Sequence, residues 1–364
     1  MSNTKTKKRI IYLDFLRFFA ILGVVLNHVS RNWTGYGLNV FIAKGFNCFG
    51  RIGVPVFLML TGVLLLNNKL PIKDFIKRRY PRVIIPYLFW LILLILFKLF
   101  VLEPTLLSGS IPKYLISFVS EKYWYVWLIL GIYLVIPIFA SFVKGSKMEG
   151  VKYFVIIWFA TTALLSLSTL FNFNLHYLDL VIYSGPIGYV MLGYYLHNRE
   201  INISPKKVVT ICLVAFILLT LVKTLVFYHD TTFFYSFRYY IFTRKSSLEI
   251  DTVTILQVAA LFLTVKYLPM VKGGICEKVT AFCNKKRILM LIISISQASY
   301  GIYLCHYFSL LSIAKILEIN HMTYNDLSSI IVVPVLTIGI MFVSYALMII
   351  LNKVPVINKL TGYH

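Results

Sequence analysis

The chain has 364 residues, of which 59% are hydrophobic and only 13% charged, and its mean hydropathy is +0.81. A soluble domain is about 25% charged, so this chain has about half the usual supply of surface charge. The composition excludes an ordinary soluble globular protein and predicts an integral membrane protein of the all-α class. We expect a single transmembrane domain over residues 1–364, because no linker or low-complexity stretch sets a soluble domain apart.

The net charge is +23, which in a soluble protein would point to nucleic acid. Here the basic residues lie in short clusters between apolar runs, a pattern typical of loops that face anionic lipid. We therefore expect contact with membrane lipids and no nucleic acid partner. The five cysteines are scattered and form no C-x-x-C pair, which favours free thiols and predicts no metal site.

Apolar windows of about 17 to 25 residues predict ten transmembrane helices. They lie near residues 10–29, 48–66, 83–102, 124–143, 153–171, 180–196, 208–228, 252–268, 291–314 and 330–351. About two thirds of the Lys and Arg residues fall in the loops that share a side with the N-terminus. The positive-inside rule then places both termini in the cytoplasm and the chain in a cell membrane, by expectation the bacterial plasma membrane.

The first predicted span contains three ionisable residues, Asp14, Arg17 and His28. Such residues are costly inside a membrane and are functional candidates by default. Eleven residues separate Arg17 from His28, so both project from one helical face with about 16.5 Å of rise between them. Asp14 can pair with Arg17. Two interpretations stay open: a structural ion pair with an interfacial histidine, or a site with a cation deep on the cytoplasmic side and an imidazole near the outer end.

The ninth predicted span contains Ser299, Tyr303 and His306 at positions i, i+4 and i+7, which form a polar stripe on one helical face. In the predicted orientation His306 lies at a depth comparable with His28, so the two histidines can share an acceptor pocket. The alternative is that the stripe only makes hydrogen bonds that hold the helix bundle together.

Two arginines, Arg79 and Arg82, lie three residues apart in a basic segment on the predicted cytoplasmic side. They can form a clamp for phosphate, or they can anchor lipid head groups. On the outer side, Glu121 precedes an aromatic cluster that begins at Trp124, and a carboxylate beside aromatic rings suits a sugar. Arg51 opens the second span, where we expect a supporting role.

Five motifs follow one another along the chain. They are residues 12–17 running to His28 as Arg-x10-His, residues 54–62, Arg79-x-x-Arg82, residues 123–128 continuing through Tyr133 and Pro137, and residues 299–306. Each motif is weak alone, but together and in this order they resemble the membrane acyltransferase-3 family, which O-acylates surface carbohydrates. Thr61 departs from the family pattern, which usually has Ser at that position.

The resemblance implies a membrane O-acyltransferase of about ten helices. It would move an acyl group, acetyl by expectation, from cytoplasmic acyl-coenzyme A to a hydroxyl of a cell-surface or lipid-linked carbohydrate. His28 would be the central catalytic residue, either as a base or as an acyl carrier. Coenzyme A phosphates would bind Arg79 and Arg82, and Arg17 would steady the donor arm.

Other residues are expected to assist this chemistry. His306 and Glu121 are further catalytic candidates, and Asp14, Tyr303 and Arg51 are supporting ones. The chain stops soon after the tenth span, so we expect it either to act directly on its acceptor or to pass the acyl group to a separate extracytoplasmic partner, and we favour direct transfer. A transporter or flippase of glycan precursors is the alternative, and paired broken helices in a repeat would favour it, but the sequence shows no repeat. The acyl group, the acceptor and the oligomeric state stay open at this point.

Overall fold

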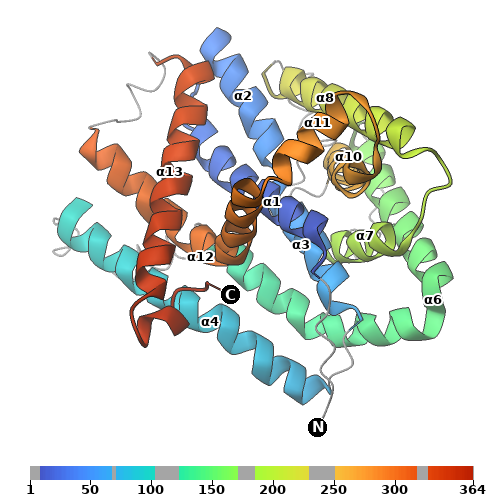
Figure 1. The fold of residues 1–364 in the computed structure, drawn as a ribbon, viewed down its shortest axis with the longest axis horizontal. Coiled ribbons are helices and arrows are strands. Elements are labelled where there is room, and N and C mark those ends of the chain that lie inside the picture. Colours follow the sequence, from blue (N-terminus) through green and yellow to red (C-terminus); the bar gives the residue numbers. More distant parts are fainter. Residues whose placement is uncertain are drawn as a thin grey trace.

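The computed structural model describes residues 9–67, 71–102, 123–170, 185–228, 251–317 and 327–363, with side chains described to residue 165 in the third of these ranges. Every regular element in these ranges is helical, which confirms the predicted all-α class (Figure 1). The α-helices are α1 (Ile11–Ser30), α2 (Leu38–Gly50), α3 (Gly53–Leu65), α4 (Ile72–Phe97), α6 (Trp124–Leu170), α7 (Ile187–Asn198), α8 (Pro205–Tyr228), α10 (Thr252–Tyr267), α11 (Gly274–Cys283), α12 (Lys286–Ile316) and α13 (Ser329–Asn352). A short π-helix follows α4 at Lys98–Leu102, and short 3₁₀ turns follow α10 and α13 at Leu268–Met270 and Ile357–Lys359.

By length and composition, 8 helical segments of the described residues can cross a membrane, which confirms a multi-pass membrane protein. One of them, α6, changes direction at Lys147, whose φ of 54° and ψ of −158° are not helical. The two arms of α6 correspond to the predicted spans 124–143 and 153–171. Ten spans and cytoplasmic termini remain predictions.

The second predicted span begins too late in the sequence. Helical structure begins at Leu38 and breaks at Arg51 and Ile52, so that α2 and α3 follow one another across a short turn. Lys44 and Asn47 lower the hydropathy of α2, and an apolar window therefore detects only the part of this segment that contains α3. The break leaves the polar residues of α2 at the predicted outer side of the bundle.

The first helix is the centre of the structure. α1 packs against α2, α3, α12 and α13, and Figure 1 shows it running through the middle of the bundle. In the apolar window of α1, 61% of residues are buried, against 28% in α8, whose Ile and Leu side chains face outward. The ionisable residues of α1 therefore face protein, and the periphery carries the lipid-exposed surface.

Small residues let α1 approach α2 and α3 closely. A Cβ atom added to Gly50 would lie 2.7 Å from the carbonyl oxygen of Gly23, and one added to Gly53 would lie 2.6 Å from that of Ala20. Membrane helices commonly use small residues in this way, because dispersion contacts replace the hydrophobic effect between helices in lipid. The contact fixes α1 beside the break between α2 and α3.

We predict that Ile76, near the start of α4, faces the cytoplasm and that Leu38, at the start of α2, faces outward. Single cysteines at these positions, in a variant without the five native cysteines, can be treated in intact cells with a membrane-impermeant thiol reagent. Position 38 should be labelled and position 76 protected. The reverse labelling pattern would show that the predicted orientation is wrong.

Candidate functional site

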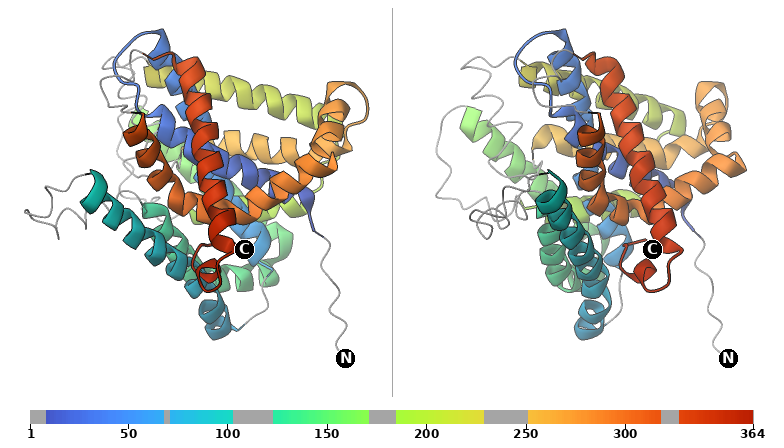
Figure 2. Two further views of the ribbon diagram at one scale, coloured as in Figure 1. Left: turned by 60° about the vertical axis from the view of Figure 1, so that its left-hand side comes forward. Right: turned by 90° about the vertical axis from the view of Figure 1, so that its left-hand side faces the viewer.

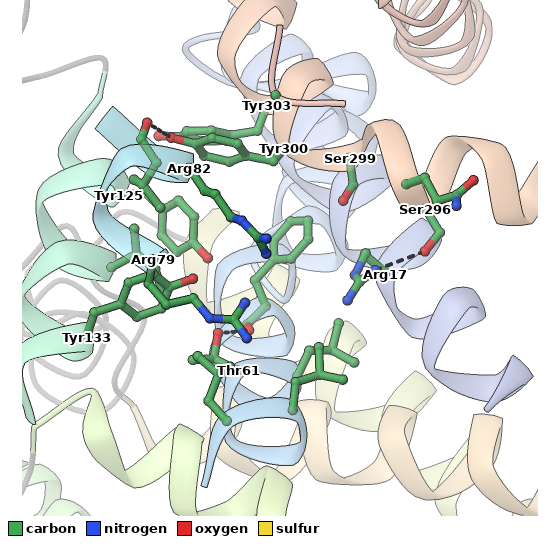
Figure 3. Close-up of a pocket in the computed structure, with 18 residues that line it drawn as sticks. Arg17, Thr61, Arg79, Arg82, Tyr125, Tyr133, Ser296, Ser299, Tyr300 and Tyr303 are labelled. Carbon is green, nitrogen blue, oxygen red and sulfur yellow. Dashed lines mark hydrogen bonds between the residues drawn. The ribbon is translucent and has the colours of Figure 1, made fainter. Parts of the chain in front are cut away.

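Three arginines from two distant helices line one cavity of about 250 Å³ (Figure 3). Arg17 projects into it from α1, and Arg79 and Arg82 come from α4, in the neighbourhood of the α12 residues Ser296 and Ser299. Helical periodicity explains the α4 pair, since residues three apart share a face. The cavity is therefore a concentrated positive site assembled by α1, α4 and α12.

None of these arginines has a carboxylate within ion-pair distance among the residues that the structure describes. The expected pairing of Asp14 with Arg17 is wrong. Asp14 instead accepts two hydrogen bonds of 2.7 Å from the Nε and Nη2 atoms of Arg9. This bidentate geometry is the preferred one for a guanidinium and a carboxylate, and it raises the pKa of Arg9. Asp14 therefore neutralises Arg9, and the charge of Arg17 stays available.

Ser296 connects Asp14 to Arg17. Its hydroxyl donates to Oδ1 of Asp14 at 2.7 Å and accepts from Nη1 of Arg17 at 3.5 Å, as the dashed line to Arg17 in Figure 3 marks. The chain of contacts from Arg9 through Asp14 and Ser296 thus orients Arg17 toward the cavity. Sequence reasoning missed Ser296, although it lies three residues before Ser299 and continues the same polar stripe.

Tyrosines form one wall of the cavity. Tyr125 and Tyr133 come from α6, and Tyr300 and Tyr303 from α12. The ring centroids of Tyr125 and Tyr303 are 5.2 Å apart, and the rings of Tyr300 and Tyr303 are stacked at 6.4 Å. The cavity thus presents cations beside flat, partly apolar surfaces, an arrangement that suits an anion attached to a larger organic group.

The two candidate histidines lie together, as their predicted depths required. The ring centroids of His28 on α1 and His306 on α12 are 5.0 Å apart, with an interplanar angle of 49°. His306 is buried and His28 half-buried. The α1–α12 interface therefore carries a cation at one level and a pair of imidazoles about 16.5 Å further along α1.

The tautomer of His306 follows from its surroundings. Its Nδ1 atom lies 2.5 Å from the carbonyl oxygen of Tyr303, and a carbonyl only accepts, so Nδ1 carries the hydrogen. Within the described residues, the buried Nε2 atom has no hydrogen-bond partner. In the neutral ring Nε2 is then an acceptor beside His28. Tyr303, which also lines the cavity, connects the two levels, since its ring centroid is 5.8 Å from that of His306.

Two of the expected site residues are not part of this arrangement as the structure describes it. Arg51 donates from Nε to Oδ1 of Asn47 at 3.0 Å and lies over the ring of Phe227, 4.6 Å from its centroid. It packs the end of α2 against α8 and does not line the arginine cavity. Glu121 lies outside the described residues.

A family model described as an acyltransferase domain matches residues 10–349. The chain belongs to the acyltransferase-3 family. The matched region contains all three arginines of the cavity and both histidines, and it identifies the protein as a membrane acyltransferase. A search of curated proteins and a search of solved structures each give no match. The resemblance seen in the sequence motifs is thus confirmed at the level of the family.

We predict that Asp14 contributes more to stability than its partner Arg9. Asp14→Ala should lower the free energy of unfolding in detergent by about 1 to 3 kcal/mol, because it removes charge-assisted hydrogen bonds from a carboxylate only 6% exposed. Arg9→Gln should cost less than about 1 kcal/mol, since the Arg9 side chain is 43% exposed. Equal losses for the two variants, in denaturant titrations, would contradict this ranking.

Proposed function

We propose that this membrane acyltransferase transfers an acetyl group from cytoplasmic acetyl-coenzyme A to a hydroxyl of a cell-surface or lipid-linked carbohydrate, in the bacterial plasma membrane. The observation that supports it most is the cavity lined by Arg17, Arg79 and Arg82. A cluster of cations with no carboxylate partner among the described residues favours a bound anion with several negative groups, and the phosphates of coenzyme A are such groups. In the predicted topology this cavity faces the cytoplasm, where the donor is made.

The separation along α1 matches the shape of such a donor. Coenzyme A places its phosphates at one end and its thioester at the other end of a flexible arm. With the phosphates at Arg79 and Arg82, the arm would pass Arg17 and Tyr303 toward the histidine pair. About 16.5 Å of helix rise lies between Arg17 and His28. The carbohydrate hydroxyl would then approach His28 from the outer side.

The transfer step needs a base for the acceptor hydroxyl. His28 would take the hydroxyl proton while the oxygen attacks the thioester carbonyl, and the carbon–sulfur bond then breaks to release coenzyme A as thiolate, which takes up a proton. In the alternative route, an imidazole nitrogen of His28 attacks the thioester carbonyl, and the carbon–sulfur bond breaks to release coenzyme A as thiolate. The acceptor hydroxyl then attacks the acetyl-imidazole, the carbon–nitrogen bond breaks, and the hydroxyl proton passes to the thiolate. His306, with Nε2 as an acceptor, would hold the neighbouring ring or the acceptor in place. Transfer to the acceptor would be direct in either route.

We predict that the double substitution of Arg79 and Arg82 by Gln weakens acetyl-coenzyme A binding. A charge-assisted hydrogen bond contributes about 1.5 to 3 kcal/mol, so loss of one bond lowers the affinity about 10- to 150-fold. Isothermal titration calorimetry of the purified protein in detergent measures the affinity for acetyl-coenzyme A.

A neighbouring arginine provides the control for that experiment. Arg78 is exposed and does not line the cavity. Arg78→Gln should therefore bind the donor like the unmodified protein. If all the substitutions have the same small effect, the basic segment anchors lipid head groups and the phosphate clamp is wrong.

We predict that His28→Ala abolishes acetyl transfer and leaves donor binding and the amount of folded protein nearly unchanged, because His28 is half-buried and distant from the arginines. Loss of acceptor ester, measured by mass spectrometry of cell-surface glycans, reports the activity. A covalent acetyl adduct on His28 under trapping conditions would select the acyl-carrier route. Near-normal transfer by the His28→Ala protein would disprove the catalytic role and direct attention to His306.

A further inference from the structure

The segment that follows α13 folds back under the helix bundle and reaches the arginine cavity. After the short turn Ile357–Lys359, the chain continues into residues 360–363, which we call the strap. Gly362 is one of the residues that line the cavity. Figures 1 and 2 show this end of the chain returning from α13 to the side of α4. The family match ends at residue 349, so the strap lies beyond the matched region.

A buried hydrogen bond attaches the strap to α4. Nε1 of Trp90 donates to the carbonyl oxygen of Thr361 at 3.1 Å. Thr361 is completely buried and Trp90 nearly so. The Thr361 hydroxyl also donates to the carbonyl oxygen of Asn358 at 3.2 Å, which holds the turn together. An unpaired buried indole N–H or carbonyl is costly, so this bond fixes the position of the strap on α4.

A second set of contacts attaches the strap to α12, at a serine that α13 also contacts. The hydroxyls of Tyr363 and Ser294 are 3.0 Å apart, and the Tyr345 hydroxyl donates to Ser294 at 2.8 Å. Tyr345 belongs to α13 and Ser294 to α12. The strap is thus bonded directly to α12 as well as to α4, and Ser294 in turn links it to α13.

The strap fits closely between α4 and α12. Gly362 has a φ of +81°, a conformation that favours glycine. A Cβ atom there would lie 3.1 Å from Cδ1 of Tyr300 and 3.2 Å from Cβ of Pro86. Neither neighbour can move far to make room for a Cβ atom, because one is an aromatic ring and the other a proline ring within a helix. The backbone itself therefore serves as the packing surface between the two helices.

Pro86 lies four residues after Arg82 and seven after Arg79, so it shares their face of α4. We propose that the strap is a positioning element of the donor site: it fixes α4 against α12 so that Arg79 and Arg82 stand opposite Arg17 across the cavity. This inference rests on the proposed function for the identity of the ligand. The cation site itself is a property of the structure.

The test compares two tryptophans that make the same type of bond at different places. Trp90→Phe removes the donor to Thr361 and keeps most of the ring. Trp33→Phe is the matched control, because Nε1 of buried Trp33 donates to the carbonyl oxygen of Leu327 at 3.1 Å, away from the cavity. The affinities for acetyl-coenzyme A and for pyrophosphate are measured by calorimetry in detergent, together with thermal stability.

We expect both variants to lose similar stability and only Trp90→Phe to bind either probe about 3- to 10-fold more weakly, as for loss of one neutral hydrogen bond. Gly362→Ala should shift binding in the same direction. Equal affinities for Trp90→Phe and Trp33→Phe would overturn the strap proposal. The Trp90 hydrogen bond would then only stabilise the fold.

Binding of the two probes to the unmodified protein distinguishes failure of the strap proposal from failure of the proposed function. Binding of pyrophosphate without acetyl-coenzyme A would contradict the donor assignment, and the strap would still be decided by the pyrophosphate affinities of the variants. Binding of neither probe would overturn both proposals.

Discussion

The rest of the structure depends on three arginines that share a cavity in which the described residues include no carboxylate. Arg17 and Arg79 are half-buried and Arg82 is exposed. Cations that share a cavity repel one another, and an anion bound between them relieves this repulsion. The protein could have neutralised Arg17 with Asp14, which lies on the same stripe of α1. It uses Asp14 to bind Arg9 instead, and the contact through Ser296 keeps Arg17 directed at the cavity. The arrangement preserves positive charge for a ligand at some expense to stability.

The central position of α1 allows one helix to serve both ends of the site. Close contact at Gly50 and Gly53 holds α1 against α2 and α3. On the face of α1 that carries the ionisable residues, α12 packs along the helix. At one level α12 supplies Ser296 to Arg17, and at the other it supplies His306 to His28. Two packed helices thus fix the distance between the cation site and the imidazole pair. A long donor with charged phosphates at one end and a reactive thioester at the other fits that spacing.

Helical periodicity predicted part of the site on single helices, although it wrongly paired Asp14 with Arg17 on α1 and did not identify Ser296 on α12. The eleven-residue separation placed Arg17 and His28 on one face of α1, and the predicted orientation of the ninth span placed His306 at a depth comparable with His28. Three features depend on contacts that a hydropathy window does not contain. Arg9 precedes the first helix yet reaches Asp14, the polar residues of α2 concealed its true start, and the strap reaches the cavity from beyond the last span. A long side chain accounts for the first of these features, local polarity within a helix for the second, and a reversal of the chain for the third.

The central claim is that a single bound donor extends from the arginine cavity to the histidine pair. Photocrosslinking with a coenzyme A thioester that carries a diazirine on its acyl group, followed by peptide mass spectrometry, tests it most directly. The account predicts labelled peptides from α1 around His28 and from α12 around His306, and the label should decrease when excess unmodified acetyl-coenzyme A competes. Label confined to the basic segment around Arg79 and Arg82, with none near His28, would contradict the account.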